Sequence, residues 1–377
     1  MAAKAAKKAK PNSGPASDSR VGVWSEIGKL RRVMVCQPDL AHQRLTPENS
    51  AELLFDDVIW LAQARRDHFD FVSKMEDHGV EVYDLQDCLA EVLKDHLARA
   101  WVLDRRLTDY LVGPNISREM RPWLEEMDAA ELARYLIGGI AFHEIPKNVA
   151  GPFLSTFAET EPAGFVIAPL PNTQFMRDNS SWIFHGVTLN PMYWPARQPE
   201  TLLTTAVYNF HPAFRDEEYN VWLGDPNGDP YDHGAATLEG GDVMPIGNGT
   251  VVIGMGERSS RQAIALVARS LFAAEAAEQV IIAALPKTRS AMHLDTVFTF
   301  CNHDVVTAFA PIIDKVEPIT LRPDSSAPGG VSVKHETKGL VETIGAALGV
   351  SFTVVETAGD VYGIQREQWD DANNVVA

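Results

Sequence analysis

The residues of this chain that could do chemistry lie in three short polar segments with apolar surroundings. Asp178 ends the first segment, Glu239 and Asp242 flank a glycine pair in the second, and His293 and Asp295 stand two apart in the third. Clustered carboxylates, one imidazole and close-approaching backbone suit a small organic cation such as a guanidinium. Each charge-assisted hydrogen bond to it would contribute roughly 1.5–3 kcal/mol, and the cation would neutralise carboxylates that are costly to bury alone.

The spacing of His293 and Asp295 leaves three interpretations open. The run around them reads as a strand, in which residues two apart point to the same face. The pair could be a hydrogen bond that only fixes structure, or part of a metal site, although no other histidine lies in a comparable setting. It could also do acid–base work, with the carboxylate orienting the imidazole and raising its pKa.

The other two segments also allow a structural reading. Most Gly-Gly pairs simply make turns, but between Glu239 and Asp242 the pair indicates backbone that approaches a ligand. It is not a phosphate loop, because no lysine follows and the charge has the wrong sign. Asp178 follows Arg177 directly, and such neighbour pairs are more often a surface detail than a site.

Attack on a guanidinium carbon would need a nucleophile, and none of the three cysteines is an obvious one. Cys301 shares strand parity with His293, but eight residues of strand would separate them by about 26 Å, too far for proton transfer. Cys36 ends an apolar strand and Cys88 opens a helical segment, so both read as buried structural thiols. Three unevenly spaced cysteines also favour a reducing compartment over a disulfide framework.

Composition narrows the class of protein. The chain has 377 residues, 45% of them hydrophobic, and a formal net charge of −18, which argues against nucleic acid as a partner. No apolar run approaches the ~20 residues of a membrane span, so we expect no membrane partner. Residues 1–20 are rich in Ala and Lys, then in Pro and Ser, which predicts a disordered basic tail and, by default, a cytoplasmic protein.

The elements that must position these residues follow an α/β rhythm with one interruption. A strand at 30–36, a helix from about Ser50 to His78 and a strand at 80–85 come first. Leucines and tryptophans at helical spacing fill 86–159, which predicts an inserted helical domain. Strands and single helices then alternate, so residues 21–85 and 160–377 form the predicted α/β domain, with further elements expected at 251–255, 259–275, 280–285, 339–348 and 352–355.

The last residues predict an unfinished element. An Asp/Asn-rich turn leads into Val375 and Val376, which read as a strand that begins and has no successor. Such a strand would leave backbone groups unpaired. We therefore expect the chain to be a fragment whose last module is incomplete, with an open sheet edge that lowers stability and favours aggregation.

At these motifs the chain resembles the arginine deiminase family, whose members modify guanidino groups. The resemblance runs from about Ser25 to the end and includes SEIGKL, LFDD, FMRD, LEGGDV, MHLDTVF and REQW. It implies a five-bladed, pseudo-fivefold α/β propeller of ββαβ modules with an inserted helical domain.

The resemblance also implies an activity and a role for each matching residue. The family hydrolyses L-arginine to L-citrulline and ammonia through a cysteine-bound thiouronium intermediate, without metal or organic cofactor. Asp178 and Asp295 would bind the guanidinium, and Glu239 would support both His293 and the guanidinium. His293 would protonate the departing ammonia and then activate water. The positions expected to bind the rest of the substrate are Asn172, Phe175, Arg197, Asp242 and Arg258.

The family's nucleophilic cysteine has no match in this chain. It belongs to a glycine-rich segment near the C-terminus, beyond Ala377, so we expect the polypeptide as it stands to be inactive. The alternatives are a non-catalytic arginine or guanidine binder, an amidinotransferase, another guanidine-modifying hydrolase and, as a minor option, a metal hydrolase. A homo-oligomer stays open.

Overall fold

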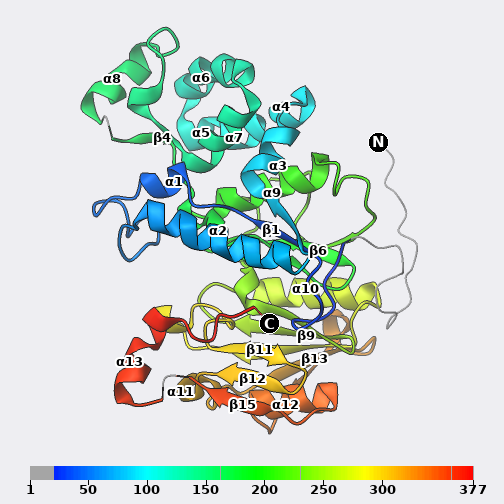
Figure 1. Ribbon diagram of the computed structural model, residues 1–377. Helices are drawn as coiled ribbons and strands as arrows, with labels where there is room; N and C mark the ends of the chain where they lie inside the picture. The colour runs from blue at the N-terminus through cyan, green and yellow to red at the C-terminus, as the bar shows by residue number, and fades with distance from the viewer. Residues whose placement is uncertain (1–20, 162, 230, 358, 377) are drawn as a thin grey trace.

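The computed structural model describes residues 21–376 apart from 162, 230 and 358, so the tail predicted for 1–20 lies outside the described residues. Figure 1 shows a mixed α/β body with a group of helices at its upper end. Within the described residues the strands form five small sheets instead of one large one. None of the described helices combines the length and the apolar character that a membrane crossing requires.

The first unit is a parallel strand pair crossed by one helix. β1 (Arg32–Val35) pairs with β2 (Glu81–Asp84), and α2 (Leu61–Asp77) connects them. The helix was predicted to begin near Ser50, and this was wrong, because the residues before Leu61 form turns and bends. Leu54 has a φ of 64°, in the left-handed region, which cannot continue an α-helix.

A group of short helices follows and shares one apolar core. Asp84, Asp95 and Asp128 each accept backbone N–H bonds at a helix N-terminus, which explains why three of these helices begin where they do. The core contains fully buried leucines and methionine, such as Leu103 and Met120. The helices are α3 (Leu85–Val92), α4 (His96–Arg106), α5 (Asp109–Val112), α6 (Pro114–Glu126), α7 (Ala129–Gly138) and α8 (Pro152–Thr160).

Returning to the α/β body, the chain forms a ββαβ unit. β5 (Ser180–Trp182) and β6 (Gly186–Leu189) make an antiparallel pair, α9 (Gln198–Phe210) crosses over, and β7 (Asn220–Leu223) adds parallel to β6. A two-stranded sheet of β3 (Ile140–Ala141) and β4 (Phe165–Ile167) precedes this ββαβ unit in the sequence.

The same order of elements occurs twice more. β8 (Val243–Gly247), β9 (Thr250–Met255), α10 (Arg261–Ala273) and β10 (Gln279–Ala284) form one unit, and the hairpin of β13 (Ile319–Pro323) and β14 (Val331–His335) extends its sheet. β11 (Phe298–Asn302), β12 (Val305–Ala308), α12 (Leu340–Leu348) and β15 (Thr353–Glu356) form the other. The strands and helices expected at 251–285 and 339–355 therefore occur within one or two residues of the predicted bounds.

The described chain ends on α13 (Val361–Asp370) and a turn. The strand predicted at Val375 and Val376 was wrong, because both residues lie outside every described strand. The remaining short elements are α1 (Leu40–Gln43), α11 (Ala310–Ile313) and the 3-10 turns η1 (Phe142–Glu144), η2 (Pro171–Gln174), η3 (Gly240–Asp242), η4 (Arg289–Ala291) and η5 (Pro328–Gly330).

Candidate active site

Three connecting segments bring the predicted chemical residues together. Asp178 lies between η2 and β5, Glu239 directly precedes η3, and His293 and Asp295 lie between η4 and β11. The strand predicted around His293 was wrong, since β11 begins only at Phe298 and residues 292–297 form bends and turns. The five acidic and imidazole residues named first in the sequence, Asp178, Glu239, Asp242, His293 and Asp295, are all buried.

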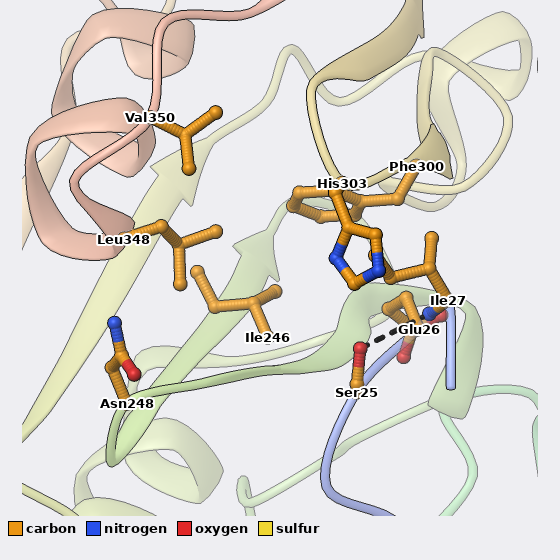
Figure 2. A pocket seen from close by; sticks show the side chains of 9 residues that line it. All are labelled: Ser25, Glu26, Ile27, Ile246, Asn248, Phe300, His303, Leu348 and Val350. Carbon is orange, nitrogen blue, oxygen red and sulfur yellow. Dashed lines mark hydrogen bonds between the residues drawn. The ribbon is translucent and has the colours of Figure 1, made fainter. Parts of the chain in front are cut away.

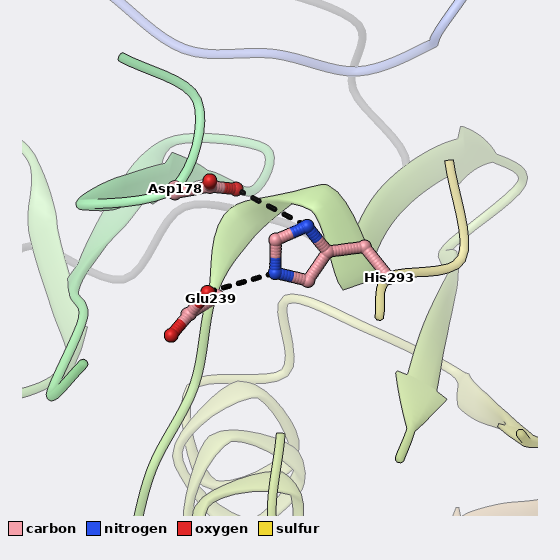
Figure 3. A group of neighbouring side chains, drawn as sticks. All are labelled: Asp178, Glu239 and His293. Carbon is pink, nitrogen blue, oxygen red and sulfur yellow. Dashed lines mark hydrogen bonds and ion pairs between the residues drawn. The ribbon is translucent and has the colours of Figure 1, made fainter. Parts of the chain in front are cut away.

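The imidazole of His293 lies between two carboxylates (Figure 3). Its Nε2 is 2.8 Å from Oε2 of Glu239, and its Nδ1 is 3.8 Å from Oδ1 of Asp178. Burial alone would lower the pKa of His293, but Asp178 and Glu239 outweigh it and raise the pKa to about 10. The ring is therefore protonated at neutral pH and can donate from both nitrogens.

The backbone of the glycine pair connects these side chains through hydrogen bonds. The Gly241 N–H donates to Oδ1 of Asp178 at 3.0 Å, and its carbonyl accepts from the backbone N–H of Asp295 at 3.0 Å. A Cβ on Gly241 would lie 2.7 Å from Nδ1 of His293 and 2.9 Å from Oδ1 of Asp295. The pair is thus more than a turn, because only glycine leaves room for the backbone beneath the ring.

Two arginines neutralise part of the acidic cluster. Arg197 Nη1 donates to Asp178 at 2.7 Å, while its Nε and Nη2 donate to the two oxygens of Glu200. Arg258 Nη1 donates to Oε2 of Glu239 at 2.9 Å. The fully buried Glu200 was missed from the sequence, and its position at i+3 from Arg197 across the start of α9 was the available signal.

The carboxylates differ in how well they are compensated. Against the opposing effect of burial, His293 and Arg197 lower the pKa of Asp178 to about 2. Burial raises the pKa of Asp295 to about 7, because His293 and Arg177 offset the burial only partly. Oδ1 of Asp295 is buried and has no hydrogen-bond partner among the described residues. Among the described residues, the site therefore contains one buried carboxylate oxygen that lacks a donor.

Asp242 acts inside the scaffold of the site. Its Oδ2 accepts from the Ser259 hydroxyl at 2.5 Å and its Oδ1 accepts from the backbone N–H of Leu294 at 2.9 Å. Burial raises its pKa to about 7, although His293 and the Ser259 bond act in the opposite direction. Asp242 thereby fixes the turn that carries His293.

The remaining predicted residues lie around this centre. Asn172 is buried and donates from Nδ2 to the carbonyl of Leu53, while its own carbonyl accepts from Arg197. Phe175 is 46% exposed, so its side chain faces solvent in part. Arg177, which reads in the sequence as a surface detail, donates to the carbonyls of Gly240 and Val243 next to the site.

Asp178, Glu239 and His293 also satisfy the spacing of a metal site, with one ligand atom from each lying within 4.8 Å of the others. A protonated imidazole has no lone pair for a metal. Asp178 and Glu239 already accept from Arg197 and Arg258. With His293 protonated and both acids paired to arginines, these three residues do not fit a metal ion in this arrangement.

Neither of the two buried thiols is activated. Burial raises the pKa of Cys36 well above its usual value and that of Cys88 to about 12, with Asp84 adding to both shifts. Cys301 lies on β11, four residues beyond Val297 and outside the turn of His293. A nucleophilic thiol needs the opposite environment, one that lowers its pKa.

Comparison with known proteins shows the family of this chain. The family model described as arginine deiminase matches residues 51–377. Among solved structures, DDAH from Pseudomonas aeruginosa complexed with citrulline is 11% identical with a TM-score of 0.39, covering 74% of this chain and 70% of that one. SxtG, an amidinotransferase from Microseira wollei, is 11% identical with a TM-score of 0.48, covering 94% and 83%.

Proposed function

The chain belongs to the arginine deiminase family, and from this premise we propose that it binds the guanidinium group of L-arginine for hydrolysis to L-citrulline and ammonia. The observation that carries the proposal is the buried Oδ1 of Asp295, which lacks a hydrogen-bond partner among the described residues. An unpaired buried carboxylate is costly. A guanidinium has the charge and the planar set of donors that would satisfy it.

In this proposal Asp178 and Asp295 hold the two sides of the guanidinium. Glu239 keeps His293 oriented through the 2.8 Å contact. His293 is protonated at neutral pH, which suits it to give a proton to the departing ammonia. Having lost that proton, the neutral ring would take one from the water that releases citrulline.

The substrate would exchange partners with the two buried arginines. In the ligand-free arrangement Arg197 donates one hydrogen bond to Asp178, and Arg258 donates one to Glu239. An incoming guanidinium would take over these acids, and the arginines could then pair with the substrate's carboxylate. Nε of Arg258 is buried and has no hydrogen-bond partner among the described residues, although it lies 3.6 Å from Oε2 of Glu257. Asn172 and Phe175 would complete the pocket, and Asp242 would act on it through the turn of His293.

The attacking thiol is not one of the three cysteines in this chain. Cys36 and Cys88 are held protonated by burial, and Cys301 lies on a strand beyond the turn of His293. We propose that these 377 residues bind L-arginine without turning it over.

We also propose the finer architecture that the family resemblance implies. The three ββαβ units and the β1–α2–β2 unit would be blades of one five-bladed propeller, and the helices of 86–159 would be an inserted domain. The polar segments of three units meet at the site, which is consistent with blades arranged around one axis.

Calorimetric titration tests the function directly. We expect L-arginine to bind and agmatine, which lacks the carboxylate, to bind more weakly, because Arg197 and Arg258 would have no partner in it. Absence of arginine binding would refute the proposal. A citrulline assay on the same sample separates binding from turnover, and robust citrulline release would refute the argument about the three cysteines.

A non-catalytic guanidine binder is the second candidate. It would keep the same contacts to Asp178 and Asp295, so binding alone does not separate it from the first. Adding a small thiol, such as free cysteine, to the chain separates the two candidates. Citrulline release that depends on His293 would favour the hydrolase.

A further inference from the structure

Arg177 lies within 4 Å of two carboxylates, those of Glu26 and Asp295. Its Nη2 donates to Oε2 of Glu26 at 2.9 Å, and its Nε lies 3.8 Å from Oδ2 of Asp295. Only the first of these is a hydrogen bond. The guanidinium also donates to the carbonyls of Gly240 and Val243, at the two ends of the turn that carries Gly241.

The two carboxylates compete for the same cation. Their side chains are almost equally shielded, with 11% of Glu26 and 12% of Asp295 exposed. Glu26 holds Arg177 in direct contact, and Oδ1 of Asp295 is left without a partner among the described residues. If Arg177 closed the 3.8 Å gap, its charge would occupy the carboxylate that a substrate guanidinium needs.

The segment of Glu26 is anchored well enough to hold Arg177 back. Val23 and Phe184 exchange two backbone hydrogen bonds, at 3.0 and 2.6 Å, and the Ile27 N–H donates to the Ser25 hydroxyl at 3.2 Å. Glu26 borders a cavity of about 210 Å³ (Figure 2), which is walled by both apolar and polar side chains. The residues drawn around this cavity include no lysine or arginine, and His303 is the one ionisable side chain among them besides Glu26.

We propose that Glu26 is a positioning residue that holds Arg177 away from Asp295, so that Asp295 stays open to a cationic substrate group. The proposal rests on the function proposed above, because it assigns Asp295 to the guanidinium. It adds a residue from the N-terminal segment, 269 positions before Asp295, that acts only through Arg177.

The ionisation of Asp295 reports which carboxylate holds Arg177. Burial raises the pKa of Asp295 to about 7, so a change in nearby charge moves its titration within an accessible range. A nearer Arg177 would lower this pKa and a missing Arg177 would raise it. The other charged groups that face Asp295 are His293, Asp178, Asp242 and Asp371.

The test compares Glu26→Gln, Arg177→Gln and the double variant. Both single changes break the ion pair between Glu26 and Arg177. If only the loss of this pair mattered, both single variants would change arginine binding in the same way. We expect Glu26→Gln to weaken arginine binding about tenfold near pH 8 and to move the pH midpoint of binding downward. Arg177→Gln should move the midpoint upward. The double variant should bind more tightly than Glu26→Gln, because the competing cation is gone.

Carboxyl carbon NMR of Asp295 in the ligand-free protein, assigned with Asp295→Asn, gives a readout that does not need binding. A lower pKa in Glu26→Gln and a higher one in Arg177→Gln support the proposal even if arginine fails to bind, which would refute only the proposed function. If the pKa of Asp295 shifts in the same direction in both variants, the proposal is overturned. It is also overturned if the wild type binds arginine and the double variant binds no more tightly than Glu26→Gln.

Discussion

Gly241 lies directly against the ring of His293: a Cβ added to it would stand 2.7 Å from the ring's Nδ1. The same Cβ would lie 2.9 Å from Oδ1 of Asp295, so one methyl group would push apart the imidazole and the open carboxylate. We expect Gly241→Ala to weaken arginine binding at least about tenfold and to cost roughly 1–3 kcal/mol of stability through overpacking.

Gly339→Ala is the matched control for this change. Gly339 precedes α12, its φ is −62°, and nothing lies within 4 Å of an added Cβ. Calorimetry and thermal unfolding of both variants are the measurements. Equal arginine affinity in the two variants would contradict the close packing of Gly241 against the site.

Much of the site could be predicted from the sequence because its chemistry is concentrated in short motifs. Asp178, Glu239, His293 and Asp295 each lie in a polar segment with apolar residues on either side, and such segments are visible without a fold. The β-strands and helices of 251–285 were predictable for a similar reason, since their apolar periodicity is regular. The local sequence pattern was therefore sufficient to predict both the site motifs and these strands and helices.

What could not be predicted depends on pairings between distant residues or on local backbone geometry. Glu200 is recognisable as part of the site only when Arg197 is known to reach Asp178. The partner of Arg177 is Glu26, 151 positions away. The helix expected from Ser50 failed because Leu54 takes a left-handed φ, which apolar spacing does not reveal.

Asp295→Asn should weaken arginine binding more than it affects folding. The change removes the charge of the carboxylate whose Oδ1 is unpaired, and one charge-assisted hydrogen bond corresponds to roughly 1.5–3 kcal/mol, or about 10- to 150-fold in affinity. Glu317→Gln, at an exposed position, is the control for loss of one negative charge. Calorimetry should show near-normal affinity in the control, and similar losses in both variants would point to a general charge effect.

The stability of the ligand-free protein should fall as the pH rises above neutrality. Folding raises the pKa of His293 from 6.5 to about 10, so its stabilising effect is complete below about pH 6.5 and is lost as the pH rises to about 10. For one proton the slope is at most about 1.4 kcal/mol per pH unit. Urea unfolding between pH 7 and pH 10 should therefore show a steeper loss in the wild type than in His293→Gln.

His335→Gln is the control for that experiment. His335 is exposed on β14, away from the site of His293. The control should keep the wild-type slope. A wild-type slope in His293→Gln would mean that His293 is not held protonated by Asp178 and Glu239.

The strand β15 predicts where the protein associates with itself. It pairs with β12 on one side only in the described part of the chain, and Val354 and Val355 are 41% and 48% exposed. An apolar strand with an open edge is a template for pairing with another chain, and a lysine at the edge opposes this. Val355→Lys should therefore reduce association in dynamic light scattering without lowering the melting temperature. Leu97→Lys removes an apolar side chain that is 78% exposed on helix α4, which has no free strand edge. If both lysine variants reduce association equally, general surface hydrophobicity and not the β15 edge is responsible.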